Sequence, residues 1–369
     1  MGLDLDEHTR AKLALLRSPE HFGSGCRGVS VIETHFAWVF VGGRFAYKLK
    51  KPIRQGPMDY RTLVGRELGC RAELALNRRL AGAVYLCVLP IRRARTGRLV
   101  LGGRGQIIDW VVKMRRLPAT RMLDRAVLRG VSIRESSAVA AVLVRFFRRA
   151  IPRPMSDFAY RRSLRQRTRA YQRELRRRDL HLPAQLVRRV TTLQLALLRH
   201  HPELFRGRGA RLIDGHGDLR AEHVYLGARS ASAPRGAAVI DCLEFDPALR
   251  RLDPAEEISQ LQLECTRLGA TPVGARLVAQ YRSQLPDELP DPLLEFYMSQ
   301  RATVHALFAA WHLRDRRFAG KEGLYLKRAR SYLQDALRCV RRALSALESP
   351  AHRRHGSRRN QAPSLHASG

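Results

Sequence analysis

Apolar residues change their spacing along the chain, and this change restricts the folds open to it. Over residues 29–51, apolar and polar residues alternate, which is typical of strands with one buried face, and two more strand-like runs follow before residue 115. From Arg134 onward, apolar residues recur at helical spacing, interrupted by three short strand-like runs. A chain whose strands come first and whose helices come later is predicted to adopt an α+β fold.

The first part of the pattern predicts a small antiparallel sheet with one helix. A Gly42-Gly43 turn joins two of the alternating runs, as is typical of a β-hairpin. Residues 61–81 carry leucines at roughly helical spacing, which predicts a helix after the hairpin. The five predicted strands are residues 29–32, 38–41, 44–50, 84–91 and 106–114.

The same patterns divide the chain into four parts. We expect a helical segment over residues 1–28, a lobe built around the sheet over residues 29–116, and a helical lobe over residues 117–348. The last part, residues 349–369, is polar, rich in Arg and His, and without periodicity. This composition predicts a disordered tail.

The chain is strongly basic, with a formal net charge of +35. Such a charge predicts non-specific attraction to polyanions. Proteins that read nucleic acids, however, concentrate their charge beside aromatic residues. The densest block, Arg161–Arg178, contains one aromatic residue and repeats at helical spacing, which favours a solvated helix face over a dedicated nucleic-acid surface.

The sequence gives no sign of a membrane segment. The longest purely apolar run, Ala138–Val144, is far shorter than the stretch of about 20 residues that crosses a bilayer. The N-terminus is acidic where a signal peptide requires positive charge. The six cysteines contain no C-x-x-C pair, which argues against a disulfide framework and a structural zinc site. We therefore expect a cytoplasmic protein.

Several residues have the chemistry that phosphoryl transfer requires. That reaction needs a lysine on the nucleotide phosphates, carboxylates on Mg²⁺ and a carboxylate that orients the acceptor hydroxyl group. Lys48 lies on a predicted strand, and Glu73 lies on the helix that follows. Asp218 falls in a loop, and Asp241 ends a short strand beyond it. This order predicts an ATP- and Mg²⁺-dependent phosphotransferase.

Five stretches of the chain resemble motifs of one known family. They are Glu33–Phe40, Ala46–Pro52, Leu76–Leu80, Val112–Pro118 and the pair formed by His216–Leu219 and Asp241–Arg250. Together they resemble the aminoglycoside/choline-kinase-type phosphotransferases, relatives of the protein kinases, over nearly the whole chain to about residue 345. The chain looks most like the bacterial phosphotransferase-like domains that are often fused to a P-loop ATPase. No G-x-x-x-x-G-K-[ST] motif occurs, so we do not expect that second domain here.

The resemblance implies a two-lobed protein-kinase-like fold. Its N-lobe, a five-stranded antiparallel sheet plus one helix, would bind ATP with Mg²⁺, and its larger helical C-lobe would carry short catalytic hairpin strands and the acceptor site. The resemblance implies that Lys48 grips the nucleotide phosphates and that Glu73 holds Lys48 by an ion pair. Asp218 would be the catalytic residue that accepts or orients the proton of the acceptor hydroxyl. Asp241 would bind Mg²⁺.

Neighbouring residues compete for two of these roles. Lys50 and Lys51 lie close to Lys48, and on an alternating strand Lys48 and Lys50 share one face. Glu67 lies on the same predicted helix as Glu73. The sequence therefore leaves both the phosphate-binding lysine and its glutamate partner open among these residues.

One position departs from the family pattern. The metal-binding Asn expected five residues after the catalytic Asp is His223 here. Imidazole is a poorer partner for Mg²⁺ than an amide oxygen, although it binds softer divalent ions well. His223 is therefore either a metal ligand in an altered site or a residue that only structures the loop.

Three further residues are expected to support the loops. By the resemblance, His216 is a scaffold residue of the loop that carries Asp218. Asp253 precedes Pro254 and is predicted to cap the next helix. The resemblance also makes Asp253 and Glu257 anchors of the catalytic and metal loops.

Three functions remain, in order of preference. The first is a kinase that moves the γ-phosphoryl group of ATP to a hydroxyl group of a small molecule. The second is a nucleotide-binding pseudokinase with a regulatory role, favoured by His223 and by the lack of a G-x-G-x-x-G phosphate loop. The third is an arginine-rich nucleic-acid-binding protein, which rests on charge alone.

The acceptor and the choice between ATP and GTP stay open. A cationic acceptor would need an acidic pocket, for which Glu222, Glu244 and Asp246 are the candidates. The net positive charge makes a neutral or anionic acceptor at least as suitable.

Overall fold

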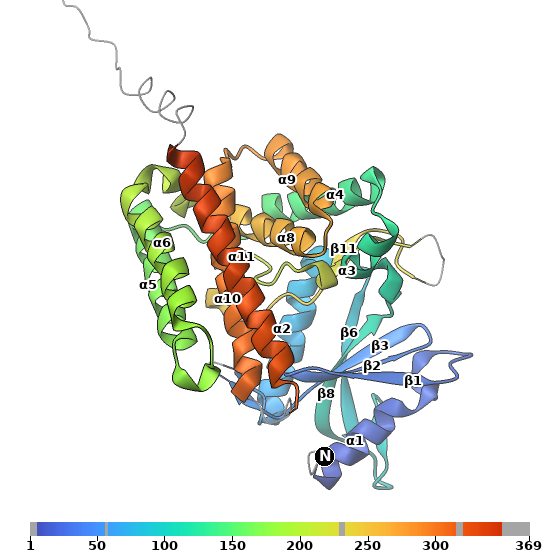
Figure 1. Cartoon of the computed structure of the whole chain (residues 1–369). Coiled ribbons are helices and arrows are strands. Elements are labelled where there is room, and N and C mark those ends of the chain that lie inside the picture. Colours follow the sequence, from blue (N-terminus) through green and yellow to red (C-terminus); the bar gives the residue numbers. More distant parts are fainter. Residues whose placement is uncertain (1–5, 56–57, 229–232, 315–319, 349–369) are drawn as a thin grey trace, which may run out of the picture. The chain divides into compact units, whose positions relative to one another are not determined.

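The structure is a computed structural model that describes residues 6–55, 58–228, 233–314 and 320–348 (Figure 1). The predicted tail, residues 349–369, lies outside the described residues. The chain divides into two compact units. Unit 1 comprises residues 1–152 and 213–285, and unit 2 comprises residues 153–212 and 286–369. The lobe boundaries expected from the sequence stay predictions.

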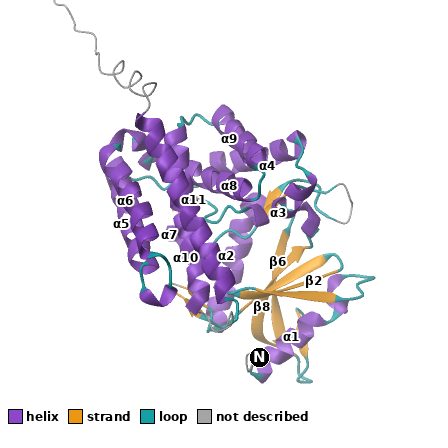
Figure 2. Cartoon of the chain, viewed as in Figure 1, coloured by secondary structure: helices purple, strands orange, loops and turns teal. Residues whose placement is uncertain are grey.

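Unit 1 is built around one antiparallel sheet, drawn in orange in Figure 2. Its strands, in spatial order, are β1 (Val29–Glu33), β2 (Ala37–Gly42), β3 (Phe45–Lys50), β8 (Gln106–Arg115), β6 (Tyr85–Arg93) and β7 (Leu99–Leu101). The predicted α+β class is confirmed. The sheet has six strands, one more than predicted. The additional strand, β7, lies in the Arg- and Gly-rich hairpin after β6, and its three residues are too few to display a period in the sequence.

The β2–β3 hairpin has the turn that its glycines predict. Gly43 has a φ of 37°, and a Cβ atom there would lie 2.5 Å from the carbonyl oxygen of Phe22. Glycine is therefore required at this close approach. In the resulting register, Trp38 lies opposite Leu49, and both side chains are buried.

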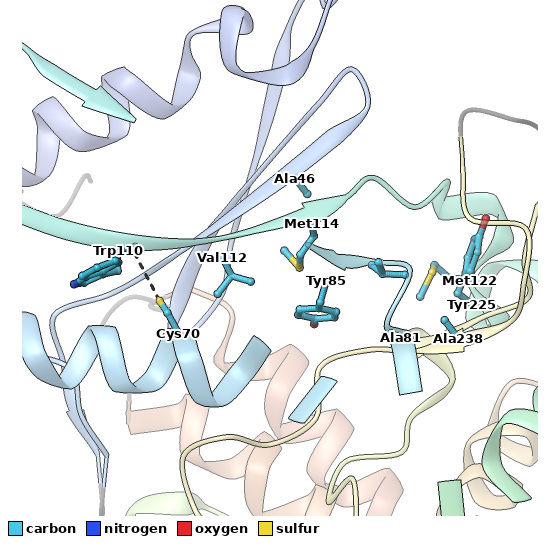
Figure 3. Packing of buried hydrophobic residues seen from close by; sticks show 11 residues of the cluster. Ala46, Cys70, Ala81, Tyr85, Trp110, Val112, Met114, Met122, Tyr225 and Ala238 are labelled. Atoms are coloured by element: carbon cyan, nitrogen blue, oxygen red, sulfur yellow. Dashed lines mark hydrogen bonds between the residues drawn. The ribbon is translucent and has the colours of Figure 1, made fainter. Parts of the chain in front are cut away.

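Helix α2 (Leu63–Ala81) packs against the sheet. Its N-terminus is capped by Thr62, whose hydroxyl oxygen accepts a hydrogen bond from the backbone three residues on. Figure 3 shows the core between helix and sheet, where Cys70 of α2 lies beside Val112 of β8. The Cys70 thiol donates a hydrogen bond to the carbonyl oxygen of Trp110. Burial of these apolar side chains fixes α2 on the sheet.

The N-terminal segment contains helix α1 (Glu7–Arg17), which joins a second core cluster with two leucines. Lys12 of α1 places its Nζ 2.8 Å from one oxygen of Asp109, a residue of β8. Arg66 of α2 places its Nε 2.6 Å from the other oxygen. All three side chains are buried. One carboxylate therefore ties α1, α2 and the sheet together.

The rest of unit 1 supplies short ribbons and helices. Two small antiparallel ribbons, β10–β11 and β9–β12, include the three short strand-like runs expected from the sequence. The elements are β4 (Arg54–Gln55), β5 (Met58–Asp59), α3 (Leu123–Ala126), α4 (Ile133–Arg149), β9 (Ile213–Asp214), β10 (Val224–Tyr225), β11 (Ala238–Val239), α7 (Pro247–Arg250), β12 (Arg251–Leu252), α8 (Pro254–Arg267) and α9 (Thr271–Gln284).

Unit 2 is helical. Its α-helices are α5 (Asp157–Leu175), α6 (Ala184–His200), α10 (Asp291–Trp311) and α11 (Glu322–Glu348). Helix α5 holds most of the arginine block, and its buried residues, such as Leu164 and Thr168, alternate with exposed arginines such as Arg162 and Arg169. This is the arrangement of a solvated helix face. Within the ranges that the structure describes, no helix is both long enough and apolar enough to span a membrane.

Candidate active site

The loop Gly215–Leu219 follows β9 and is held by helix α8. The Oε1 atom of Glu257 accepts hydrogen bonds from the backbone N–H groups of His216 and Gly217, both at 2.6 Å. Gly217 has a φ of 87°, a left-handed conformation that favours glycine. Local sequence and one buried carboxylate on α8 therefore fix the backbone of this loop.

His216 is a neutral, fully buried residue of the loop. Burial, with a smaller effect from the nearby imidazole of His223, lowers the pKa of His216 to about 4. Its Nε2 lies 2.9 Å from the carbonyl oxygen of Ile240, which can only accept, so Nε2 carries the proton. Its Nδ1 accepts a hydrogen bond from the backbone N–H of Asp218 at 3.2 Å. His216 thus braces the loop and is not placed to act as a base.

Asp218 is oriented by side chains from two directions. Gln260 of α8 donates a hydrogen bond from Nε2 to Asp218 Oδ1 at 3.2 Å. The other carboxylate oxygen lies 3.8 Å from Nδ1 of His223. The side chain of Asp218 is 13% exposed, so it reaches the surface of unit 1 while its direction is fixed. Gln260 had no signal in the sequence, because its role depends on the fold.

Asp241 lies just after β11 in a left-handed conformation, with a φ of 64°. Its backbone N–H donates to the hydroxyl oxygen of Tyr85 at 3.3 Å, and the next N–H, of Cys242, donates to Oδ1 of Asn77 at 2.9 Å. Side chains of β6 and α2 therefore hold this turn. Burial raises the pKa of Asp241, but the stronger combined attraction of Lys48 and His223 holds it below its usual value, so the carboxylate is ionised.

Lys48 of β3 connects Asp241 with Glu73 of α2. Its Nζ lies 2.7 Å from Asp241 Oδ1 and 2.9 Å from Glu73 Oε1. Burial opposes the charge of Lys48, yet the two carboxylates raise its pKa well above the usual value. The structure thus brings together three of the residues predicted from the sequence.

The competing residues have other partners. Glu67 pairs with Arg71 on the outer side of α2. Lys51 pairs with Glu33 at 2.6 Å and donates to the carbonyl oxygen of Thr34. Among the residues weighed from the sequence, Lys48 and Glu73 are therefore the pair that meets Asp241.

Lys50 belongs to the same cluster as Lys48. Its Nζ lies 2.7 Å from Oε2 of Glu73 and 2.5 Å from Oε1 of Glu244. The hydroxyl group of Tyr60 also donates to Glu244, at 3.0 Å. The sequence suggested Glu244 only as part of an acidic pocket for a cationic acceptor. Its pairing with Lys50 spans 194 positions and has no local signal.

The other two carboxylates suggested for such a pocket also have internal partners. Glu222 lies 2.6 Å from Arg220. Asp246 accepts a hydrogen bond from the backbone N–H of Ala248 at 2.8 Å and caps α7. A cationic acceptor would therefore have to compete with these contacts.

His223 lies between Asp218 and Asp241. Its Nδ1 is 2.8 Å from the carbonyl oxygen of Asp218, which can only accept, so Nδ1 carries a proton. Its Nε2 lies 3.6 Å from Asp241 Oδ2. Nε2 is therefore the ring atom that would bind a metal, in the form of the ring that carries no proton there.

The donor set fits a metal that is also bound by substrate phosphates. Mg²⁺ in nucleotide sites is held by one or two carboxylates together with phosphate oxygens and water. Asp241, 45% exposed and ionised, meets that requirement. Among the described residues, no group of three His, Cys, Asp or Glu side chains forms a metal site by itself.

Comparisons with known proteins begin with sequence. No known family profile matches the chain. It is 31% identical over 305 residues to uncharacterised proteins of Mycobacterium tuberculosis and Mycobacterium bovis, a match that covers 75% of this chain and 54% of theirs. The chain therefore spans about half the length of the curated relatives it matches.

Solved structures share the fold. A choline/ethanolamine kinase family protein from Mesorhizobium loti matches with a TM-score of 0.52 at 15% identity, over 95% of this chain and 98% of its own. A choline kinase from Streptococcus pneumoniae gives 0.52 at 13%, over 89% and 99%. A spectinomycin phosphotransferase, solved with ADP and spectinomycin, gives 0.50 at 12%, over 91% and 99%. The chain thus has the protein-kinase-like fold of choline kinases and aminoglycoside phosphotransferases.

Proposed function

We propose that this protein is a kinase that transfers the γ-phosphoryl group of ATP, with Mg²⁺, to a hydroxyl group of a small molecule. The observation that carries the proposal is the connected set of charges in unit 1. Lys48 pairs with both Glu73 and Asp241, and the imidazole of His223 lies between Asp241 and Asp218. Phosphoryl transfer requires a cation, a metal-binding carboxylate and a second carboxylate near one another.

Each residue has a distinct role in this proposal. Asp218, oriented by Gln260, would accept or orient the proton of the acceptor hydroxyl. Lys48 would contact the nucleotide phosphates, and Glu73 would hold it. Asp241 would bind Mg²⁺ with His223 beside it; when bound, the metal neutralises charge on the phosphates.

Support for the substrate class comes from the fold neighbours. Their names identify kinases of choline and of spectinomycin, and one was solved with ADP. We extend to this chain only the general class, a nucleotide and a small molecule with a hydroxyl group. We expect the reaction in the cytoplasm, where ATP is available. The kinship with domains fused to a P-loop ATPase stays a prediction.

A nucleotide-binding pseudokinase is the second candidate. It is favoured by His223, which replaces an amide with an imidazole whose Nδ1 is already used by the carbonyl oxygen of Asp218. Such a protein would bind nucleotide without transferring phosphate.

The test measures nucleotide binding and then turnover. We expect ATP with Mg²⁺ or Mn²⁺ to raise the melting temperature of the wild-type protein. Asp241→Ala should abolish that rise, and the matched control Asp124→Ala, which removes the partner of exposed Arg125, should keep it. In a screen of hydroxyl-bearing acceptors with labelled ATP, Asp218→Asn should lower turnover by about 10²-fold or more.

Different outcomes separate the candidates. No thermal shift with any nucleotide and metal would reject both of them. A shift without transfer to any acceptor would favour the pseudokinase. Turnover by Asp218→Asn at the wild-type rate would remove Asp218 from its role.

A further inference from the structure

Two lysines of β3 share the carboxylate of Glu73. Lys48 Nζ lies 2.9 Å from Oε1, and Lys50 Nζ lies 2.7 Å from Oε2. The lysines are two positions apart, so the alternation of the strand places both on one face. Glu73 is fully buried. Each oxygen of one buried carboxylate therefore has its own cation.

The two lysines differ in their second partner. Lys48 pairs with Asp241, whose side chain is 45% exposed, whereas Lys50 pairs with Glu244, whose side chain is 9% exposed. Lys50 is itself buried, and its Nζ lies 4.9 Å from the centre of the Tyr60 ring. Lys48 is therefore the lysine that a ligand can reach, and Lys50 is enclosed.

Helix α2 is shaped to enclose Lys50. A Cβ atom on Gly69 would lie 2.5 Å from Cε1 of Tyr60, so the Tyr60 ring packs directly on the helix. Gly69 and Glu73 are four residues apart and lie on one face of α2. The Tyr60 hydroxyl is bonded to Glu244, which completes the enclosure.

An anionic ligand at Lys48 would change the balance of charge at Glu73. The ammonium group of Lys48 would interact with the ligand, which weakens its ion pair with Glu73. A buried carboxylate that loses its counter-charge is strongly destabilised. Lys50 stays with Glu73, because Glu73 is buried and the side chain of its other partner, Glu244, is only 9% exposed. We propose that Lys50 is a positioning residue that keeps Glu73 paired and in place, so that Lys48 is available to a phosphate group. This inference rests on the proposed function, in which the ligand is a nucleotide.

The first test compares two ligands in one variant. Without Lys50, Lys48 would be the remaining cation on Glu73, so Lys50→Met should weaken MgATP binding by about tenfold in calorimetric titrations. Adenosine has no phosphate to meet Lys48, and its affinity should stay unchanged. Equal weakening of MgATP and adenosine would overturn the proposal, because it would mean general damage.

Lys12→Met is the matched control. Lys12 is also a buried lysine on a shared carboxylate, Asp109, which keeps Arg66 as its second cation. This control should change the affinity for MgATP by less than about twofold. A tenfold loss in Lys12→Met would overturn the inference, because the effect would then follow from removing any buried lysine.

A second test asks whether Lys50 acts through Glu73. In a Glu73→Gln background the charge of Glu73, through which Lys50 is proposed to act on Lys48, is gone, so adding Lys50→Met should change the affinity for MgATP by less than about twofold. An undiminished loss in that background would show that Lys50 acts by another route.

A third test needs no nucleotide. In urea unfolding, Lys50→Met should lower the midpoint more than Lys48→Met does, and Glu73→Gln should reduce that loss. If the wild-type protein bound no MgATP, the proposed function would be wrong. The urea midpoints would still test whether Lys50 stabilises the protein through its ion pair with Glu73. Equal losses in Lys48→Met and Lys50→Met would overturn it.

Discussion

The loop around Asp218 depends on the protonation state of a single residue, His216. The imidazole donates to one backbone group through Nε2 and accepts from another through Nδ1. The neutral ring makes both contacts, whereas the charged ring has no acceptor for the N–H of Asp218. Stability of this loop is therefore linked to pH.

We predict that the free energy of unfolding falls as the pH drops from about 6.5 to about 4. The pKa of His216 is about 4 in the folded protein, against 6.5 for a histidine exposed to water, so between these pH values the unfolded chain binds a proton that the folded chain does not. The loss should approach about 3 kcal/mol at pH 4. Urea unfolding at several pH values measures it.

Two variants separate this effect from other titrations. His216→Gln should flatten the decline, whereas His200→Gln, which changes an exposed histidine, should leave it intact. A decline of the same steepness in His216→Gln would assign the pH dependence to other groups.

Single residues also show which parts of the candidate site could be predicted from the sequence. The chemistry and order of Lys48, Glu73 and Asp241, together with the family resemblance, pointed to these three residues. In the structure, Lys48 Nζ lies 2.9 Å from Glu73 Oε1 and 2.7 Å from Asp241 Oδ1. The choice of Glu73 over Glu67 could not be made from helical spacing alone. It depends on which face of α2 meets β3, a tertiary property.

At the scale of elements, helix α8 acts as a support for the loop after β9. Asp253 caps the helix, as predicted, by accepting from the backbone N–H of Ala255 at 2.9 Å. Glu257 and Gln260, three residues apart on one helix face, contact the backbone and the carboxylate of the loop. One rigid element therefore sets both the position and the direction of Asp218.

We predict that Glu257→Ala destabilises unit 1 by about 3 kcal/mol, because it leaves two buried backbone N–H groups without their acceptor. The same variant should lower turnover, since the loop that carries Asp218 loses its support. Thr266→Ala, an exposed change on the same helix, should cost less than about 0.5 kcal/mol. Urea unfolding compares the two; equal, small losses would mean that the loop is held by other contacts.

Elements with a clear period were predictable, and the others were not. Strands β2 and β3 and helix α2 follow from their alternation, their glycine turn and their leucines. Strand β7 did not, because its three residues form a strand only through pairing with β6. The pairing of β9 with β12 joins segments far apart in the chain and likewise depends on the fold.

At the scale of the whole molecule, charge is the dominant property. The net charge of +35 is carried mostly by arginine, and helix α5 exposes several of these residues. Charge of this kind attracts polyanions by releasing their counter-ions rather than by reading a sequence.

We predict weak, salt-sensitive binding to DNA of any sequence. Affinity measured by fluorescence anisotropy at about 50 mM salt should be lost by about 200 mM salt, with a linear fall of log affinity against log salt. Two duplexes of unrelated sequence should behave alike. Binding that persisted at the higher salt and distinguished the duplexes would instead favour a nucleic-acid-binding function.

The left-handed backbone conformation of Asp241 limits which residues can replace it in related proteins. At a φ of 64°, Asp, Asn and Gly are the residues accommodated with least strain. A change from Asp to Asn would therefore preserve the shape of the turn while removing its negative charge. The backbone conformation therefore does not select the carboxylate over the amide. Retention of Asp at this position across homologues would instead reflect selection for its negative charge, which pairs with Lys48 and is the charge that the proposed chemistry needs.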